Sequence, residues 1–157
     1  MTSEAVQAFG QMSDPWRAEL GEHYPLLTKS CSAGSLTTLL QSGERAVVVQ
    51  LLTETAAVLR QHAGTHLHVS LAHEGGLWCA RVYTLLRGLT FVHRELRAER
   101  PSTALTALAR ELEAPALHRF GTLSVARTQS LAAGEIEIVA RYEDGRELPP
   151  VRGKSRH

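Results

Sequence analysis

The chain has 157 residues, of which 43% are hydrophobic and 21% are charged, a mixture typical of one globular domain and unlike a collagen-like, coiled-coil or disordered chain. Lys and Arg together number 17 and Asp and Glu 16, so the formal net charge is +1, and aromatic residues make up only 5%. We therefore expect no basic nucleic-acid interface and no aromatic platform on which bases stack.

The N-terminal region predicts helices. The amphipathic pattern over residues 3–20 depends on apolar side chains three or four positions apart, namely Ala5, Phe9, Met12, Trp16 and Leu20. Pro15 indicates a second helix start and Gly21 a helix end. This region contains neither a secretory signal nor an apolar run of about 20 residues, so we expect no membrane span. We assign residues 1–25 to an N-terminal helical segment.

The two cysteines indicate a reducing compartment. Cys31 and Cys79 are far apart in the sequence and form no CxxC motif. Reduced thiols and a cytoplasmic location are the expected state, with a single disulfide as the alternative.

The next segment is predicted to contain a helix, a strand and a second helix. Ser35 is predicted to cap a helix that runs to Gln41, and Gly43 to end it. The apolar, β-branched residues 46–52 do not alternate with polar ones, which favours a strand covered on both faces. Residues 54–62 favour a short helix that ends at Gly64.

A β-hairpin is the clearest local prediction. Residues 66–71 alternate between polar and apolar side chains, and residues 74–76 (Glu-Gly-Gly) supply a turn before the returning strand at 78–86. The alternation places Leu67, Val69 and Leu71 on one face of the first strand. On the second strand it places Trp78, Ala80, Val82 and Thr84 on one side and Cys79, Arg81, Tyr83 and Leu85 on the other.

The C-terminal half predicts a helix and more strands. Residues 91–96 either extend the sheet or begin an amphipathic turn, and residues 94–100 form a solvated connection. Ser102 is predicted to cap a helix through Leu112, and the ranges 123–127 and 135–142 to be strands. Residues 152–157 are a basic tail. The predicted fold class is α+β, with helices packed on an antiparallel sheet.

Two arginines are candidates for binding an anion. Arg81 interrupts an otherwise apolar strand, and a guanidinium on a half-buried sheet face needs a negatively charged partner. That partner is either a carboxylate from a neighbouring strand or the carboxylate of a ligand. Arg127 presents the same two alternatives.

Other polar pairs have simpler explanations. His66 and His68 have a spacing found in metal sites, which His62 or His73 would complete, but no acidic or cysteine residue stands at a partner spacing. We therefore expect a polar strand face and assign no metal ligand, with a metal site through His66 and His68 as the alternative. Glu135 and Glu137 lie on one strand face, where solvation is expected rather than acid/base catalysis.

Several segments, taken in order over residues 26–150, resemble chorismate pyruvate-lyases. They are the Ser-Leu-Thr-Thr-Leu-Leu start at 35–40, the Val-rich run at 47–52, Gly-Gly-Leu-Trp-Cys-Ala-Arg at 75–81, the Leu-rich helix before Pro115, and the Asp-Gly-Arg turn at 144–146. The same fold occurs in ligand-sensing (UTRA-type) domains of bacterial transcription regulators. The resemblance implies an antiparallel sheet of about six strands within residues 26–151 and a pocket for a small aromatic acid.

The resemblance also implies site residues and a reaction. Arg81 matches the family's arginine, and Leu36 matches a residue whose backbone lies by the ligand. His68 falls where the family has a second arginine, and Arg127 is a further candidate for binding the ligand. The family cleaves chorismate to 4-hydroxybenzoate and pyruvate, a step toward hydroxybenzoate and ubiquinone, without a metal or an organic cofactor.

Two functions remain open at this point. The family's glutamate falls within residues 148–153, which contain no carboxylate, and its second arginine is missing. The first function is binding, with or without cleavage, of chorismate or a hydroxybenzoate-like acid. The alternative is a non-catalytic domain for ligand sensing or protein interaction on the same fold.

Overall fold

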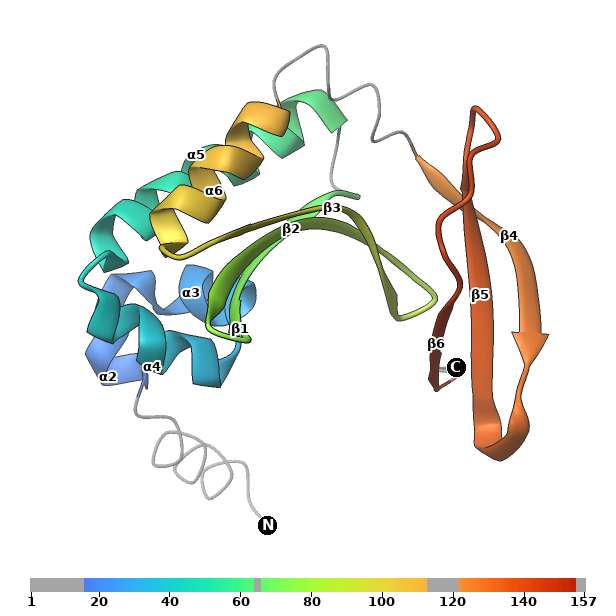
Figure 1. The fold of residues 1–157 in the computed structure, drawn as a ribbon, viewed down its shortest axis with the longest axis horizontal. Coiled ribbons are helices and arrows are strands. Elements are labelled where there is room, and N and C mark those ends of the chain that lie inside the picture. The colour runs from blue at the N-terminus through green and yellow to red at the C-terminus, as the bar shows by residue number, and fades with distance from the viewer. Residues whose placement is uncertain (1–15, 64–65, 113–121, 155–157) are drawn as a thin grey trace.

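The structure, a computed structural model, describes residues 16–63, 66–112 and 122–154 (Figure 1). Most of the helix predicted over residues 3–20 therefore lies outside the described residues. The first described stretch is mainly helical. It comprises α2 (Trp16–Leu20), the 3-10 turn η1 (Gly21–His23), α3 (Tyr24–Ser30), α4 (Ala33–Ser42) and α5 (Arg45–Ala63).

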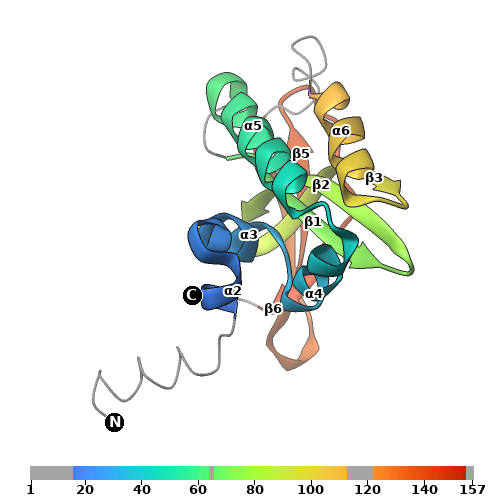
Figure 2. The ribbon, with the colours of Figure 1, turned by 90° about the vertical axis from the view of Figure 1, so that its left-hand side faces the viewer.

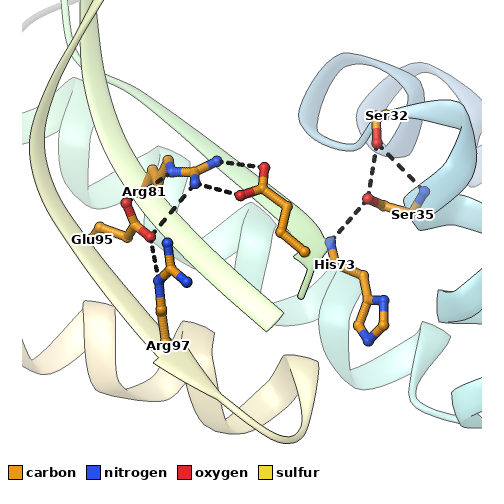
Figure 3. Close-up of polar contacts among 7 residues, drawn as sticks. Ser32, Ser35, His73, Arg81, Glu95 and Arg97 are labelled. Carbon is orange, nitrogen blue, oxygen red and sulfur yellow. Dashed lines mark hydrogen bonds and ion pairs between the residues drawn. The ribbon is translucent and has the colours of Figure 1, made fainter. Parts of the chain in front are cut away.

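Helix α4 is capped by Ser32 and not, as predicted, by Ser35. The Ser32 side chain accepts a hydrogen bond from the backbone N–H of Ser35 (3.4 Å), and Gly43 ends the helix in a left-handed conformation with φ +74°. The Ser35 hydroxyl instead accepts a hydrogen bond from the backbone N–H of His73 in the first strand (2.9 Å; Figure 3). Ser35 thus joins α4 to the sheet.

Helix α5 replaces the strand predicted at residues 46–52. Its buried side chains are Val48, Leu52, Thr55 and Leu59, which repeat at the spacing of one helix face, whereas Val47 is exposed. A short apolar run has no clear period of its own, so its helical register becomes evident only over the whole length of the helix. The helix begins at Arg45, whose guanidinium donates hydrogen bonds to the carbonyl oxygens of Glu19 (3.1 Å) and Leu20 (3.1 Å).

The six described strands form two sheets and not the single six-stranded sheet that was expected. Both sheets are antiparallel, with strand orders β1-β2-β3 and β4-β5-β6, so the α+β class is confirmed. The strands are β1 (His68–Glu74), β2 (Leu77–Leu86), β3 (Leu89–Ala98), β4 (Leu123–Ser130), β5 (Glu135–Tyr142) and β6 (Val151–Lys154).

Two segments predicted to be irregular are strands. Strand β3 continues through residues 94–98, where the solvated connection was expected, because its inward side chains Leu96 and Ala98 pack against the core. Strand β6 takes up the first part of the predicted basic tail. Within it, Arg152 donates a hydrogen bond to the carboxylate of Glu137 on β5 (2.7 Å).

Helix α6 (Pro101–Glu111) follows β3 and buries the predicted face of Leu105, Leu108 and Leu112. The predicted cap Ser102 is wrong, because it lies inside the helix and its side chain donates to the carboxylate of Glu44. The backbone N–H of Ser102 also donates to Glu44 (3.2 Å). A carboxylate from the loop between α4 and α5 therefore stabilises the start of α6.

The main core lies between the helices and one face of the first sheet. Helices α5 and α6 lie side by side over this face (Figures 1 and 2). The residues predicted to share a face of each hairpin strand lie in this core or pack against it, which confirms the alternation for Leu67, Val69, Leu71, Trp78, Ala80 and Val82. Thr84, the last residue of the predicted face, is buried and bonds to His93. The opposite face of β2 carries Cys79 and Arg81.

A second core joins the two sheets. Leu89 and Phe91 of β3 pack against the apolar face of the second sheet, which supplies Leu123, Ile138, Ala140 and Tyr142. Gly153 of β6 lies so close to Leu89 that a Cβ at this position would clash with a Leu89 methyl group. The second sheet therefore stands beside the tip of the β2–β3 hairpin (Figure 1).

His93 bridges the same junction with hydrogen bonds. A register shift in the β2–β3 pairing leaves His93 without a Cα partner between Val92 and Arg94, as in a β-bulge. Its Nε2 lies 2.6 Å from the Thr84 hydroxyl, and its Nδ1 lies 2.6 Å from the Tyr142 hydroxyl on β5. Burial, together with the nearby His66, lowers the pKa of His93 to about 4.

We expect acid to weaken this junction through His93. The unfolded chain binds a proton at His93 more tightly than the folded protein does, so this contribution to stability is complete above about pH 6.5 and falls as the pH decreases toward 4. The shift corresponds to roughly 3 kcal/mol for a fully buried ring, and we expect about 2 kcal/mol for this half-buried one. Urea unfolding at several pH values measures it. In His93→Gln the free energy of unfolding should fall less on acidification, by that amount. Parallel plots of unfolding free energy against pH for the two proteins would contradict the prediction.

Candidate functional site

Arg81 is bound by carboxylates of the chain itself. Its guanidinium donates two hydrogen bonds to Glu74 (3.1 and 2.8 Å) and two to Glu95 (3.2 and 3.5 Å), and its side chain is 21% exposed. Arg97 approaches Glu95 from the other side (2.7 Å; Figure 3). The alternative of a carboxylate from a neighbouring strand is thus confirmed. A ligand carboxylate would have to displace Glu74 or Glu95.

The carboxylates of this cluster are held in the charged state. Hydrogen bonds from Arg81 keep the pKa of Glu74 below its ordinary value. Burial alone would raise the pKa of Glu95, but hydrogen bonds from Arg81 and Arg97 outweigh it and lower the pKa. The cluster therefore resembles a structural ion-pair network on the open face of the first sheet.

Arg127 and Leu36 also have structural partners. The Arg127 guanidinium donates to both carboxylate oxygens of Glu147 (3.3 and 3.2 Å), which Arg141 contacts as well (2.7 Å). Leu36 is fully buried in the main core, within α4. Within the described part of the chain, Arg81, Arg127 and Leu36 do not line a pocket together with His68.

A pocket of about 220 Å³ lies between α3, α5 and the beginning of the first sheet. Its apolar lining comes from all three, with Leu26 from α3, Leu59 from α5, and Leu67 and Val69 from the start of the hairpin. Drug-sized ligands usually occupy pockets of roughly 300–1,000 Å³, so this one suits a smaller guest.

The polar lining of this pocket is mostly basic. It consists of Lys29 on α3, Arg60 on α5, His68 on β1 and Tyr83 on β2, besides the small residue Ser30. None of Lys29, Arg60 and the Tyr83 hydroxyl forms a hydrogen bond or ion pair with another described residue. No described carboxylate lines the pocket. This concentration of unpaired positive charge next to apolar surface favours an organic anion.

His68 and Tyr83 form the aromatic side of the pocket. They are direct partners across the β1–β2 pair, and their ring centroids are 5.4 Å apart at an interplanar angle of 33°. Burial lowers the pKa of His68, and electrostatic effects of Lys29 and His66 lower it further. The imidazole is consequently neutral at neutral pH.

Of the four site residues predicted from the sequence, His68 alone lines this pocket, and the pocket residues Lys29, Arg60 and Tyr83 were missed. Lys29 and Arg60 lie on helices, one of which was predicted only in part because its first half was taken for a strand. A single long helix over 45–63 would have placed Arg60 beside the buried Leu59.

The cysteine and metal predictions can also be compared with the structure. Cys31 and Cys79 are free and buried, and burial raises the pKa of the Cys31 thiol to about 12. Over the described ranges, no three His, Cys, Asp or Glu side chains form a group that could hold a metal ion. None of the described helices has the length and apolar character needed to cross a membrane.

Comparison with known proteins identifies no relative. No protein-family model, no curated protein and no solved structure matches the chain. The resemblance to chorismate pyruvate-lyases therefore stays an expectation, and an argument about function has to start from the pocket itself.

Proposed function

We propose that the protein binds a small aromatic carboxylate in the pocket formed by α3, α5, β1 and β2. The observation that carries this proposal is that two basic side chains, Lys29 and Arg60, line the pocket together with apolar side chains and with no carboxylate of the described residues. An unpaired cation that lines a pocket is a natural partner for an anionic ligand.

Each part of the pocket has a role in this proposal. Lys29 and Arg60 hold the carboxylate, while Leu59, Leu67 and Val69 contact the ring. Tyr83 offers a hydroxyl that can donate to or accept from a polar group on the ring. A pocket of about 220 Å³ suits a ligand with one ring, such as 4-hydroxybenzoate.

We keep cleavage of chorismate as the activity to test on the same pocket. General acid/base catalysis requires a group that transfers a proton, and the polar side chains available for this are His68 and Tyr83. Incubation of the purified protein with chorismate, followed by assays for pyruvate and 4-hydroxybenzoate, separates an enzyme from a binder.

Calorimetric titration with 4-hydroxybenzoate tests binding. A ligand of this size should bind with a Kd of about 0.1–1 mM, and at ten times the Kd it should raise Tm by about 3–5 °C. The substitutions Lys29→Gln and Arg60→Gln should each weaken binding about fivefold, because each removes one charge-assisted contact.

Two controls make this test specific. Arg110→Gln removes an equally exposed helical arginine outside the pocket and should leave Kd unchanged. 4-Hydroxybenzyl alcohol has the same ring without the carboxylate and should not bind measurably. If 4-hydroxybenzoate and chorismate both fail to bind, or if Arg110→Gln weakens binding as much as Arg60→Gln does, the proposal is wrong.

A protein-interaction domain is the second candidate function. The specific observation in its favour is that Arg81 and Arg127 are already neutralised by Glu74, Glu95 and Glu147. Strand β4 is also an edge strand of the second sheet, and its last four residues are exposed. Edge strands can pair with another chain. Failure of both acids to bind would favour this second function.

A further inference from the structure

The charged groups around His68 suggest how binding in this pocket is regulated. Lys29 from α3, Arg60 from α5 and Tyr83 from β2 line the same pocket as His68, and His66 lies in the segment before β1. Of these groups, Lys29 and His66 lower the pKa of His68 electrostatically. Among the described residues, the pocket lining contributes no negative charge to this environment. A protonated His68 would therefore add a third positive charge to a small space.

Coulomb's law gives the consequence of this arrangement. Like charges repel each other, and the charge of Lys29 acts on the His68 ring, so the ligand-free pocket disfavours a protonated imidazole. An anion that binds between Lys29, Arg60 and His68 reverses the sign of the local field. The same imidazole then gains a partner for its N–H groups when it is protonated.

We infer that binding of a carboxylate in this pocket is coupled to uptake of a proton by His68. This inference rests on the proposed function, because it requires an acid to bind there. If the bound carboxylate favours protonation of His68, then protonation of His68 favours binding of the carboxylate by the same factor. The protein consequently holds its ligand more tightly at mildly acidic pH and releases it as the pH rises.

The size of the effect follows from linkage. Consider the pH range in which His68 is protonated in the complex but not in the ligand-free protein. Within this range, each pH unit changes the apparent Kd by up to about tenfold. Burial and the positive charges near the free ring lower the pKa of His68, whereas a bound carboxylate raises it. We expect 4-hydroxybenzoate to bind about three- to tenfold more tightly at about pH 6 than at about pH 8.

The experiment is calorimetric titration with 4-hydroxybenzoate at several pH values, in buffers with different enthalpies of ionisation. The dependence of the observed heat on the buffer gives the number of protons taken up. The expected result is net proton uptake near pH 6.5 by the unmodified protein and by His73→Gln, a control on the same strand outside the pocket. In His68→Gln both the uptake and the pH dependence of Kd should disappear.

The outcomes separate this inference from the proposed function. Tight binding with no proton uptake would overturn the inference and leave the proposed function intact. Loss of coupling in His66→Gln but not in His68→Gln would assign the proton to the other histidine and also overturn it. Failure of 4-hydroxybenzoate to bind at any pH would overturn both. An NMR titration of the His68 ring with and without the ligand checks the assignment directly.

Discussion

Replacing Phe91 with alanine should destabilise the protein by about 3–5 kcal/mol. Phe91 is 0% exposed and is the largest fully buried side chain of the second core. It belongs to β3 of the first sheet, but its neighbours Leu123, Ile138 and Tyr142 belong to the second sheet. The substitution therefore leaves a cavity at the junction of the two sheets, and urea unfolding measures the loss.

The location of this cavity leads to a second observable. Hydrogen exchange should accelerate more in β4 and β5 than in α5 and α6, because the helices pack in the main core. Leu85→Ala is the matched control, since Leu85 lies on the neighbouring strand and is 49% exposed. It should cost less than about 0.5 kcal/mol. A loss below about 1 kcal/mol for Phe91→Ala would contradict the packing described.

Replacing Glu44 with alanine should have the next largest effect, a loss of about 2–3 kcal/mol. The Glu44 side chain is 8% exposed and receives hydrogen bonds from the Arg100 guanidinium and from both the backbone and hydroxyl of Ser102. Burial alone would raise the pKa of Glu44, but these hydrogen bonds lower it, so the carboxylate is charged. Its removal leaves donors at the start of α6 without their acceptor.

Two further substitutions refine this prediction. Glu44→Gln retains an acceptor but no charge, and it should lose about half as much stability as Glu44→Ala. Glu54→Ala removes an exposed carboxylate that accepts from Gln50 alone among the described residues, and its effect should stay below about 0.5 kcal/mol. Chemical unfolding at neutral pH compares the three proteins. Equal stabilities for Glu44→Ala and Glu54→Ala would show that Glu44 does not anchor α6.

Hydrophobic periodicity and turn residues predicted the structure correctly where it depends on segments that are adjacent in the sequence. The hairpin of β1 and β2 was predicted with the residues that share each face of its strands, because alternation and a Glu-Gly-Gly turn act over a few residues. The same holds for β5 and for the buried face of α6. By contrast, residues 46–52 carry β-branched side chains with no clear period, so a strand and a buried helix gave the same local pattern.

Capping was harder to predict than the helices themselves. Ser35 and Ser102 have the residue type of a cap, but their hydroxyl groups bind His73 and Glu44, which are 38 and 58 positions away in the sequence. Residue type indicates what a side chain can accept or donate. Which partner it meets depends on segments that are brought together only when the chain folds.

The sequence by itself determined the α+β class, the antiparallel hairpin and the residues that share each face of its strands, because these depend on interactions between neighbours along the chain. Only the tertiary structure decided that six strands divide into two sheets, that Arg81 is neutralised by Glu74 and Glu95, and that Lys29, Arg60, His68 and Tyr83 line one pocket. The physical reason is that a sheet boundary, an ion pair and a pocket depend on long-range packing, in which burial selects one partner among many of similar chemistry.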